Sequence, residues 1–349
     1  MNMLEQIRDG VYRIGVTLPQ NPLRELNSYV ICGDGRNLLI DTGFNRPECL
    51  EALQGGIREL GLDMECTDIF LTHLHSDHVG LASQVAGKGS RIYMNPIDNA
   101  GMNRFLTHPD GWGNQALRFL GEGFPPDELA VVKENNPGRK YRPNSVLEAI
   151  PVEDGTEIEV GGVRLKGIFT PGHTPGHTCL FCEEEGVLFT GDHVLFDITP
   201  NISIWEEMRD PLATYFVSLG KIAQLKVSLC LPGHRATNTD LQGRIQSLLH
   251  HHQVRLEEVV RIVKDQPGIN GYEVAKRMTW SIRAKGWEDF PSGQKWFAVG
   301  EALTHLACLT GLGALRRDEE LGTAAYLPGA PVDIAAAIRD YFEGRVSPK

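Results

Sequence analysis

Four side chains that can bind a metal ion lie within six residues of one another. The segment from His73 to His78 reads His-Leu-His-Ser-Asp-His and follows residues 68–72, a short run with the composition of a β-strand. Imidazole and carboxylate together form the donor set that suits zinc, iron or manganese. This pattern would arise by chance less than about once in a thousand such chains. It predicts a metal site rather than the alternative, a polar turn capped by Ser76 and Asp77.

Three later segments each place a metal-donor side chain after a glycine, where an expected strand gives way to a loop. Taken singly, a histidine in such a loop is more often a hydrogen-bonded structural residue. Their joint presence after the first motif favours the interpretation as ligands. The donors are His173 and His177 on one Pro/Gly-rich loop, Asp192 after Gly191, and His234 after Gly233.

The order of these segments resembles the metallo-β-lactamase superfamily, and within it the glyoxalase II-like branch with a binuclear metal site. The resemblance covers roughly residues 10–250, and all seven ligand positions of that branch are filled. It implies an α/β fold, a four-layer αββα sandwich with the metals at one edge. It also implies that His73, His75 and His177 hold one ion, that Asp77, His78 and His234 hold the second, and that Asp192 bridges the two.

The resemblance also assigns residues that support the ligands. Of the two histidines on the Pro/Gly-rich loop, the family pattern selects His177 and leaves His173 as a structural residue behind the ligands. Asp41 matches an acid that orients the ligand histidines and nearby backbone. The implied cofactors are two metal ions, with zinc favoured and iron or manganese as alternatives.

Such a pair of ions indicates hydrolysis. Two metals about 3.5–4 Å apart can share a water and lower its pKa to about 7. Asp77 is the predicted catalytic residue, because its second oxygen can orient the hydroxide and pass a proton to the leaving group. The family's true β-lactamases generally lack a bridging aspartate at the Asp192 position, so antibiotic hydrolysis is not expected as the main activity.

The first 250 residues alternate between strand and helix signals, and the predicted strands and helices must position these side chains. Residues 10–16, 27–32 and 37–40 read as strands, and a Gly-Asp-Gly turn joins the last two. Strands resume from Ala149, so helices flanking sheets are expected. Residues 95–148 break the rhythm and are too long for an ordinary connection. We interpret them as a helical insertion over the active site.

The substrate pocket is expected between this insertion and the segment that follows Asp192. Phe124, Asn201 and Trp205 are its predicted lining residues. The aromatic side chains of the insertion could equally form a small core of their own. Those side chains are Phe105, Trp112, Phe119 and Phe124.

The pattern changes after residue 252, so we predict a catalytic domain over residues 1–252 and a second domain over 253–349. Three expected helices, at 254–265, 271–278 and 297–309, precede an expected β-hairpin at 313–327, which is the order of a winged helix. The region resembles the winged-helix domain of one group of superfamily hydrolases, which includes an animal endoribonuclease of the β-lactamase-like type.

RNA cleavage therefore stays open as the alternative activity, since a phosphodiester suits two metals equally well. The expected third helix carries Glu301 and His305 but no Lys or Arg, whereas a helix that reads nucleic acid is normally basic. The net charge of −11 also works against nucleic-acid binding. We interpret the second domain as a module for packing, dimerisation or completing the pocket.

Composition points to an ordinary globular protein of the reducing cytoplasm. The chain of 349 residues contains no apolar run of 18 residues and no apparent secretory signal. Its seven cysteines are scattered, and Cys179 and Cys182 are expected to pack as small apolar groups in a strand. No membrane partner is expected, and a homodimer is left open.

The leading function is hydrolysis of a thioester or ester of a small acid or acyl carrier. The C-terminal glutathione-binding helices of glyoxalase II proper have no counterpart here, so its own substrate is not expected. The alternative is a metal-dependent endoribonuclease or phosphodiesterase. A third hypothesis is a metal-free binding module that retains the fold, and analysis of bound metal would distinguish it.

Overall fold

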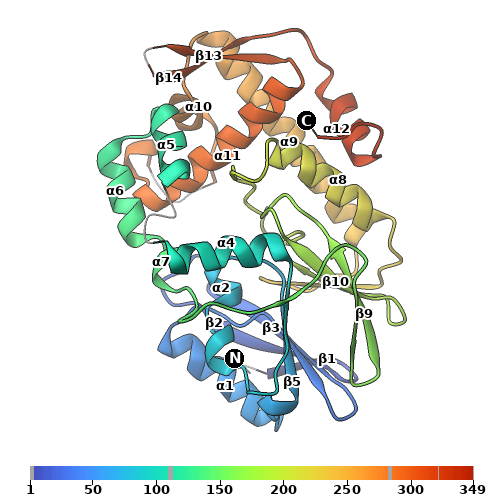
Figure 1. Ribbon diagram of the computed structural model, residues 1–349. Coiled ribbons are helices and arrows are strands. Elements are labelled where there is room, and N and C mark those ends of the chain that lie inside the picture. The colour runs from blue at the N-terminus through green and yellow to red at the C-terminus, as the bar shows by residue number, and fades with distance from the viewer. Residues whose placement is uncertain (1–3, 109–112, 282–284, 321, 349) are drawn as a thin grey trace.

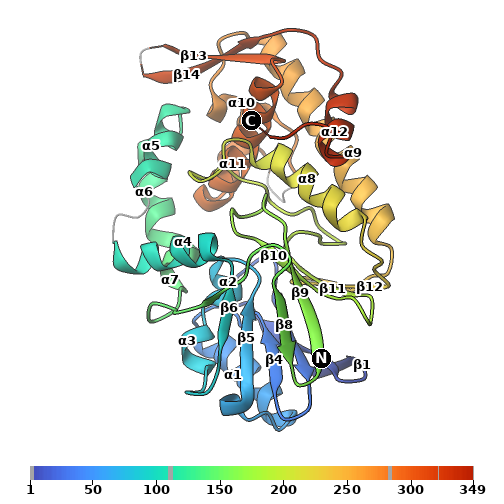
Figure 2. The same cartoon turned by 45° about the vertical axis from the view of Figure 1, so that its right-hand side comes forward.

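Two β-sheets lie face to face in the computed structural model, which describes residues 4–108, 113–281, 285–320 and 322–348 (Figures 1 and 2). Within these residues the first sheet has seven strands in chain order: β1 (Leu4–Arg8), β2 (Val11–Thr17), β3 (Glu25–Cys32), β4 (Asn37–Ile40), β5 (Thr67–Leu71), β6 (Ile92–Met94) and β7 (Ile150–Pro151). The second has the order β12-β11-β10-β9-β8, with bounds β8 (Glu157–Val160), β9 (Val163–Phe169), β10 (Thr178–Cys182), β11 (Val187–Gly191) and β12 (Leu229–Pro232).

Three apolar cores separate the layers, because neighbouring residues of a strand point to opposite faces. On β5, Ile69 and Leu71 pack toward α1 (Pro47–Glu59) and α3 (Ala82–Val85), whereas Phe70 packs between the sheets. On β10, Leu180 packs between the sheets, whereas Phe181 faces α8 (Pro211–Ala223) and α9 (Leu241–Asp265). The predicted α/β fold with a four-layer αββα sandwich is confirmed.

The same alternation explains the C-x-x-C pair of the second sheet. Cys179 lies in the core beneath the helices and Cys182 lies between the sheets, so the two thiols face opposite sides of β10. Both are free and buried. They act as small apolar packing groups, as their place in an apolar strand predicts.

Parallel strand pairs bring the predicted site segments to one edge of the sandwich. β4 and β5 are parallel, so the chain leaves both at the same end, at Asp41 and at Thr72. β11 and β12 are also parallel and end at Gly191 and Pro232, directly before Asp192 and Gly233. The sheet geometry therefore gathers residues from widely separated parts of the chain.

The predicted insertion is helical in its described residues. It carries α4 (Pro96–Thr107), α5 (Gly113–Gly121), α6 (Pro126–Asn135) and α7 (Pro137–Lys140). α4 begins after Asn95, whose side chain accepts a hydrogen bond from the Ile97 amide, with Pro96 as the first helical residue. Figure 1 shows α5 and α6 beside the C-terminal region and α7 near α2 (Ser76–Val79).

The C-terminal region is mainly helical. α9 runs without a break through residue 252, where the sequence predicts a domain boundary. After it come α10 (Gly271–Arg277), the short helix η2 (Trp287–Asp289), α11 (Ser292–Gly311), the antiparallel pair β13 (Leu315–Glu320) and β14 (Thr323–Pro328), and α12 (Ile334–Phe342). In the described parts of the chain, no helix is long and apolar enough to cross a membrane.

Polar contacts fasten the insertion to the C-terminal region. Glu122 of the insertion is buried and accepts a hydrogen bond from the Tyr326 hydroxyl at 3.1 Å, while Arg317 pairs with the same carboxylate at 3.1 Å. Lys295 pairs with Glu128 at 2.8 Å. Glu122, Glu128 and Lys295 are largely shielded from solvent, so both pairs link the insertion to the C-terminal region.

At the sheet end opposite the site segments, Asp68 joins β5 to two arginines. Its carboxylate is fully buried and accepts hydrogen bonds from Arg36 Nε and Arg91 Nε, each at 2.9 Å, and from the Arg91 amide at 2.9 Å. Burial by itself raises the pKa of Asp68, but the bonds from Arg36 and Arg91 outweigh it and hold the pKa below its ordinary value.

We expect Asp68→Asn to lower the free energy of unfolding at neutral pH by about 2–3 kcal/mol, because two arginines lose their buried acceptor. The folded-state pKa of Asp68 is depressed, so its contribution is present above about pH 4 and is lost as the pH falls through the folded pKa. Urea unfolding at pH 7 and at pH 3 should show the difference between wild type and variant shrinking in acid. An equal difference at both pH values would contradict this account.

Candidate metal centre

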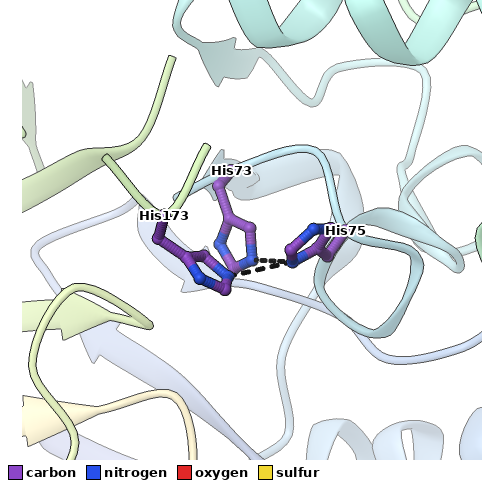
Figure 3. A group of neighbouring side chains, drawn as sticks. All are labelled: His73, His75 and His173. Atoms are coloured by element: carbon purple, nitrogen blue, oxygen red, sulfur yellow. Dashed lines mark hydrogen bonds between the residues drawn. The ribbon is translucent and has the colours of Figure 1, made fainter. Parts of the chain in front are cut away.

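Three histidines converge at the edge where β5 ends. His73 and His75 follow that strand, and His173 comes from the loop that enters β10 (Figure 3). His75 Nδ1 lies 3.1 Å from His73 Nε2 and 3.0 Å from His173 Nε2. Each residue therefore offers one nitrogen within 4.8 Å of the others, which is the arrangement of a three-ligand site.

A second group of donors lies beside the first. Asp77, His78 and His234 each offer one ligand atom within 4.8 Å of the others, and His234 Nε2 is 3.3 Å from Asp77 Oδ2. Asp192 lies between the two groups. Its carboxylate is 3.8 Å from His173 Nε2, 3.5 Å from His78 Nε2 and 3.6 Å from His234 Nε2. The structure thus gathers acid and imidazole donors from four loops into one buried cluster.

Hydrogen bonds fix the tautomer of three of these histidines. Nδ1 of His78 lies 2.8 Å from Asp41 Oδ2, that of His173 lies 2.7 Å from the Asn201 carbonyl, and that of His234 lies 2.8 Å from the Glu25 carbonyl. Carboxylate and carbonyl oxygens can only accept, so Nδ1 carries the proton in each case. Nε2 of each ring faces the cluster, and it is the nitrogen that a metal-binding histidine uses when Nδ1 is bonded in this way.

The cluster passes a further test of fit to a cation. Among the described residues, His78 Nε2, His234 Nε2 and Asp192 Oδ1 are buried without a hydrogen-bond partner. Buried polar atoms are bonded in the great majority of cases. These three atoms lie on neighbouring side chains, and a cation bound between them would provide the partner that each atom lacks.

Burial leaves the histidines of the first group in the state that binds metal. It lowers the pKa of His73 well below its ordinary value, and neighbouring His78 and His75 add to the effect. It lowers the pKa of His75 to about 3, with His173 contributing. Both imidazoles are therefore neutral at physiological pH, which keeps a nitrogen lone pair available.

The structure places His173, and not His177, in the three-histidine group. The family pattern predicts the reverse. His177 Nδ1 lies 2.9 Å from the Thr170 hydroxyl, and His177 Nε2 accepts a hydrogen bond from the Asp192 amide at 3.2 Å. Both ring nitrogens are thus occupied. His177 directly precedes the buried strand β10 and packs beneath the cluster, whereas His173 lies farther out on the loop.

Asp41 lies behind the cluster. Its carboxylate accepts hydrogen bonds from the Thr72 amide at 2.9 Å and the Thr72 hydroxyl at 2.8 Å, besides its contact with His78. Its φ of +60° lies in the left-handed region, which is uncommon for a residue other than glycine. The strained backbone directs one carboxylate to both the end of β5 and the first turn of α2.

Asp98, which the sequence analysis did not single out, links the two loops of the three-histidine group. This fully buried residue of α4 accepts hydrogen bonds from the Leu74 amide at 3.0 Å, the Thr174 hydroxyl at 2.6 Å and the Gly176 amide at 2.6 Å. Burial raises its pKa to about 7 in spite of these bonds. Asp98 belongs to no recognisable motif, and its position at the start of the insertion offered no signal.

A cavity of about 400 Å³ opens beside the cluster. Asn201 and Trp205, which the sequence analysis places in the wall of the substrate pocket, both line this cavity. They also hold the His173 loop, since the Asn201 carbonyl binds His173 Nδ1 and Trp205 Nε1 donates to the His173 carbonyl at 3.0 Å. The cavity wall and the ligand cluster therefore share these two residues.

The aromatic side chains of the insertion divide between cavity and core. Phe105 lines the cavity. Phe124, predicted as a lining residue, is instead only 2% exposed and packs edge to face against Phe119 with ring centroids 5.8 Å apart. Phe119 in turn stacks on Trp296 of α11, so the C-terminal region gives this core its other half. Trp112 lies outside the described residues.

The C-terminal region also contributes to the cavity, through Trp296 and Phe297 at the start of α11. Phe297 is half exposed. The sequence analysis placed the pocket between the insertion and the segment after Asp192. It gave completing the pocket as one of three roles for the C-terminal region, but it singled out neither Trp296 nor Phe297. An aromatic pair at a helix start gives no hint of what it faces until the helix is docked.

Comparisons with known proteins agree with this geometry. The model of the metallo-beta-lactamase superfamily matches residues 22–234. The crystal structure of a metallo-beta-lactamase family protein from Thermus thermophilus superposes with a TM-score of 0.78 at 30% identity, covering 93% of this chain and all of that one.

Curated fungal proteins are also similar in sequence. Lactamase-like protein adaB of Aspergillus niger is 27% identical over 337 residues, which span 85% of this chain and 88% of that protein. Atrochrysone carboxyl ACP thioesterase nsrC of Aspergillus novofumigatus is 29% identical over 250 residues, or 70% of this chain and 60% of that protein. With the family match extending from the first sheet to His234, this chain belongs to the metallo-beta-lactamase superfamily.

Proposed function

We propose that this metal-dependent hydrolase is binuclear and glyoxalase II-like, and that it cleaves thioesters or esters of a small acid or of an acyl carrier. The observation that carries the proposal is the pair of donor groups that meet at Asp192. Its relatives include two proteins named as atrochrysone carboxyl ACP thioesterases, which supports a thioester as the bond that is cleaved.

The geometry favours a specific ligand set. His73, His75 and His173 would hold one ion, Asp77, His78 and His234 the other, and Asp192 would contact both. His173 replaces His177 in this assignment because Nε2 of His173 faces the cluster, while both nitrogens of His177 have partners. Imidazole and carboxylate donors favour zinc, with iron or manganese as alternatives.

When bound, two such ions would lower the pKa of a shared water to about 7 and polarise the oxygen of the scissile bond. The chain's own residues would orient the attacking water and exclude bulk solvent. Asp77 lines the cavity and holds a carboxylate oxygen near His234, leaving its other oxygen to orient the attacking water and pass its proton to the leaving thiol or alcohol. Leu74 and Val79 would exclude bulk water from the acyl group.

The C-terminal region fits a winged helix that completes the pocket. Its three helices and hairpin occur in the winged-helix order, but α11, the third helix, is mostly buried between the insertion and α8–α9. Its lysine, Lys295, is paired with Glu128. A helix enclosed in this way cannot enter a nucleic-acid groove. Hydrolysis of a small substrate is therefore favoured over endoribonuclease activity.

We expect Asp77→Asn to reduce kcat/KM for a short acyl thioester by at least about 100-fold, because the side chain loses the charge that positions the water and moves its proton. The melting temperature of the variant should stay close to that of wild type. Asp34→Asn, at an exposed turn between β3 and β4, is the charge-matched control. Equal turnover in the Asp77 and Asp34 variants, or activity that survives removal of metal by a chelator, would contradict the proposal.

Substitutions of the two histidines on the Pro/Gly-rich loop should distinguish an effect on metal binding from an effect on stability. We expect His173→Ala to lower bound metal by about one ion per chain after dialysis against zinc, since it removes one of three ligands. His177→Ala should retain the metal and lower the free energy of unfolding by about 1–3 kcal/mol, because Thr170 and the Asp192 amide lose a buried partner. Elemental analysis and urea unfolding measure the two effects. The opposite pattern of metal loss would restore His177 as the ligand.

A further inference from the structure

The cavity beside the cluster contains one positive side chain without an acidic partner. Among the described residues that line it, Arg142 is the sole lysine or arginine, and most of the others are apolar, such as Leu195 and Ile198. One amino group of Arg142 donates to the Phe105 carbonyl at 2.6 Å. Within the described ranges, Arg142 forms no ion pair with a carboxylate, and its hydrogen bond goes to a backbone carbonyl.

Among the described residues, Arg142 has no carboxylate partner although the chain carries a net charge of −11. Arg104, next to the cavity-lining Phe105, is paired with Glu207, whereas Arg235 and Arg244 donate to backbone carbonyls of residues that line the cavity. Arg142 is partly buried, so its guanidinium has lost part of its hydration without gaining a counter-charge. An anionic group in the cavity would supply that counter-charge, and the planar guanidinium is suited to bind a carboxylate through two hydrogen bonds.

The backbone that carries Arg142 is held in place by the segment after β4. Asn45 donates from its side chain to the Arg142 carbonyl at 2.9 Å and from its amide to the Tyr141 carbonyl at 3.0 Å. The Tyr141 ring packs on Phe44 with centroids 5.0 Å apart. With its guanidinium also fixed by Phe105, the side chain is positioned before a ligand binds, which reduces the entropic cost of binding.

Arg142 lies close to the helix that carries two of the proposed metal ligands. α7, which ends two residues before it, contacts α2, the helix of Asp77 and His78. The Tyr141 carbonyl is packed so closely against Gly80 that a Cβ at that glycine would come within 2.5 Å of it. Arg142 also lines the same cavity as His75 and Asp77, so a group that it binds would belong to the acyl part of the substrate and not to the far end of a carrier.

We propose that Arg142 selects substrates whose acyl group carries a carboxylate, so that the enzyme acts on half-thioesters or half-esters of dicarboxylic acids. The carboxylate pairs with the guanidinium, and the apolar walls enclose the carbon chain. This inference rests on the proposed hydrolase function and specifies its substrate class. Arg142 binds substrate at a distance from the bond that breaks, so its loss affects KM and selectivity before kcat.

Four thioesters test the assignment. Butanoyl and succinyl groups are each attached to N-acetylcysteamine and to 4′-phosphopantetheine, so that an anion is present or absent at either end of the substrate. Wild type should prefer succinyl by about 10- to 100-fold in kcat/KM on both carriers, the range expected for one charge-assisted pair. Arg142→Gln should abolish that preference while retaining butanoyl turnover. Arg58→Gln, an exposed arginine of α1 outside the cavity, is the charge-matched control.

Binding of the corresponding non-hydrolysable amides, measured by calorimetry, gives a readout that does not depend on turnover. Wild type should bind the succinyl amide more tightly than the butanoyl amide, and Arg142→Gln should bind the two alike. A succinyl preference that survives in Arg142→Gln overturns the inference, as does a loss confined to the phosphorylated carrier. Selective binding without hydrolysis of any thioester would overturn the proposed function and leave the anion contact supported.

Discussion

The structure depends on buried polar side chains that are held in one orientation before any ligand arrives. Nδ1 atoms of His78, His173 and His234 each face an oxygen that can only accept a hydrogen bond, and this sets which nitrogen points into the cluster. The oxygens come from the strained residue Asp41, from Asn201 in the cavity wall and from Glu25 at the start of β3. The sandwich is therefore the means of placing a few acceptors behind the imidazoles, and the apolar cores keep those acceptors from moving.

Much of the fold follows from local sequence, and so does the recognition of the first motif of the candidate site. The His73–His78 motif follows a strand directly, so its chemistry can be recognised without tertiary information. Histidines on the Pro/Gly-rich loop cannot be separated in this way, because both follow a glycine and only the packed structure shows that His177 lies under the Asp192 amide. Asp98 shows the same limit, since its partners Leu74 and Thr174 lie 24 and 76 residues away in the sequence.

The sequence could not separate the aromatic side chains of the insertion that line the cavity from those that form a core, for a related reason. Phe124 and Phe105 both belong to the insertion, yet one is buried against Phe119 and the other lines the cavity. The difference arises because α5 and α6 dock on α11, a contact between segments more than 150 residues apart. Hydrophobicity predicts that a side chain is buried, but it does not predict which residues the side chain packs against.

The continuous helix α9 spans the expected boundary at residue 252, so the sandwich and the C-terminal region share one helix. One end of α9 packs on the second sheet and the other supports α11, whose first residues close the cavity. A family that retained the sheet edges while exchanging the segment after α9 could change the size and shape of the acyl chain it admits, with the hydrolytic apparatus untouched. Diversity among relatives would then be concentrated in the tail of the chain and in the insertion that docks against it.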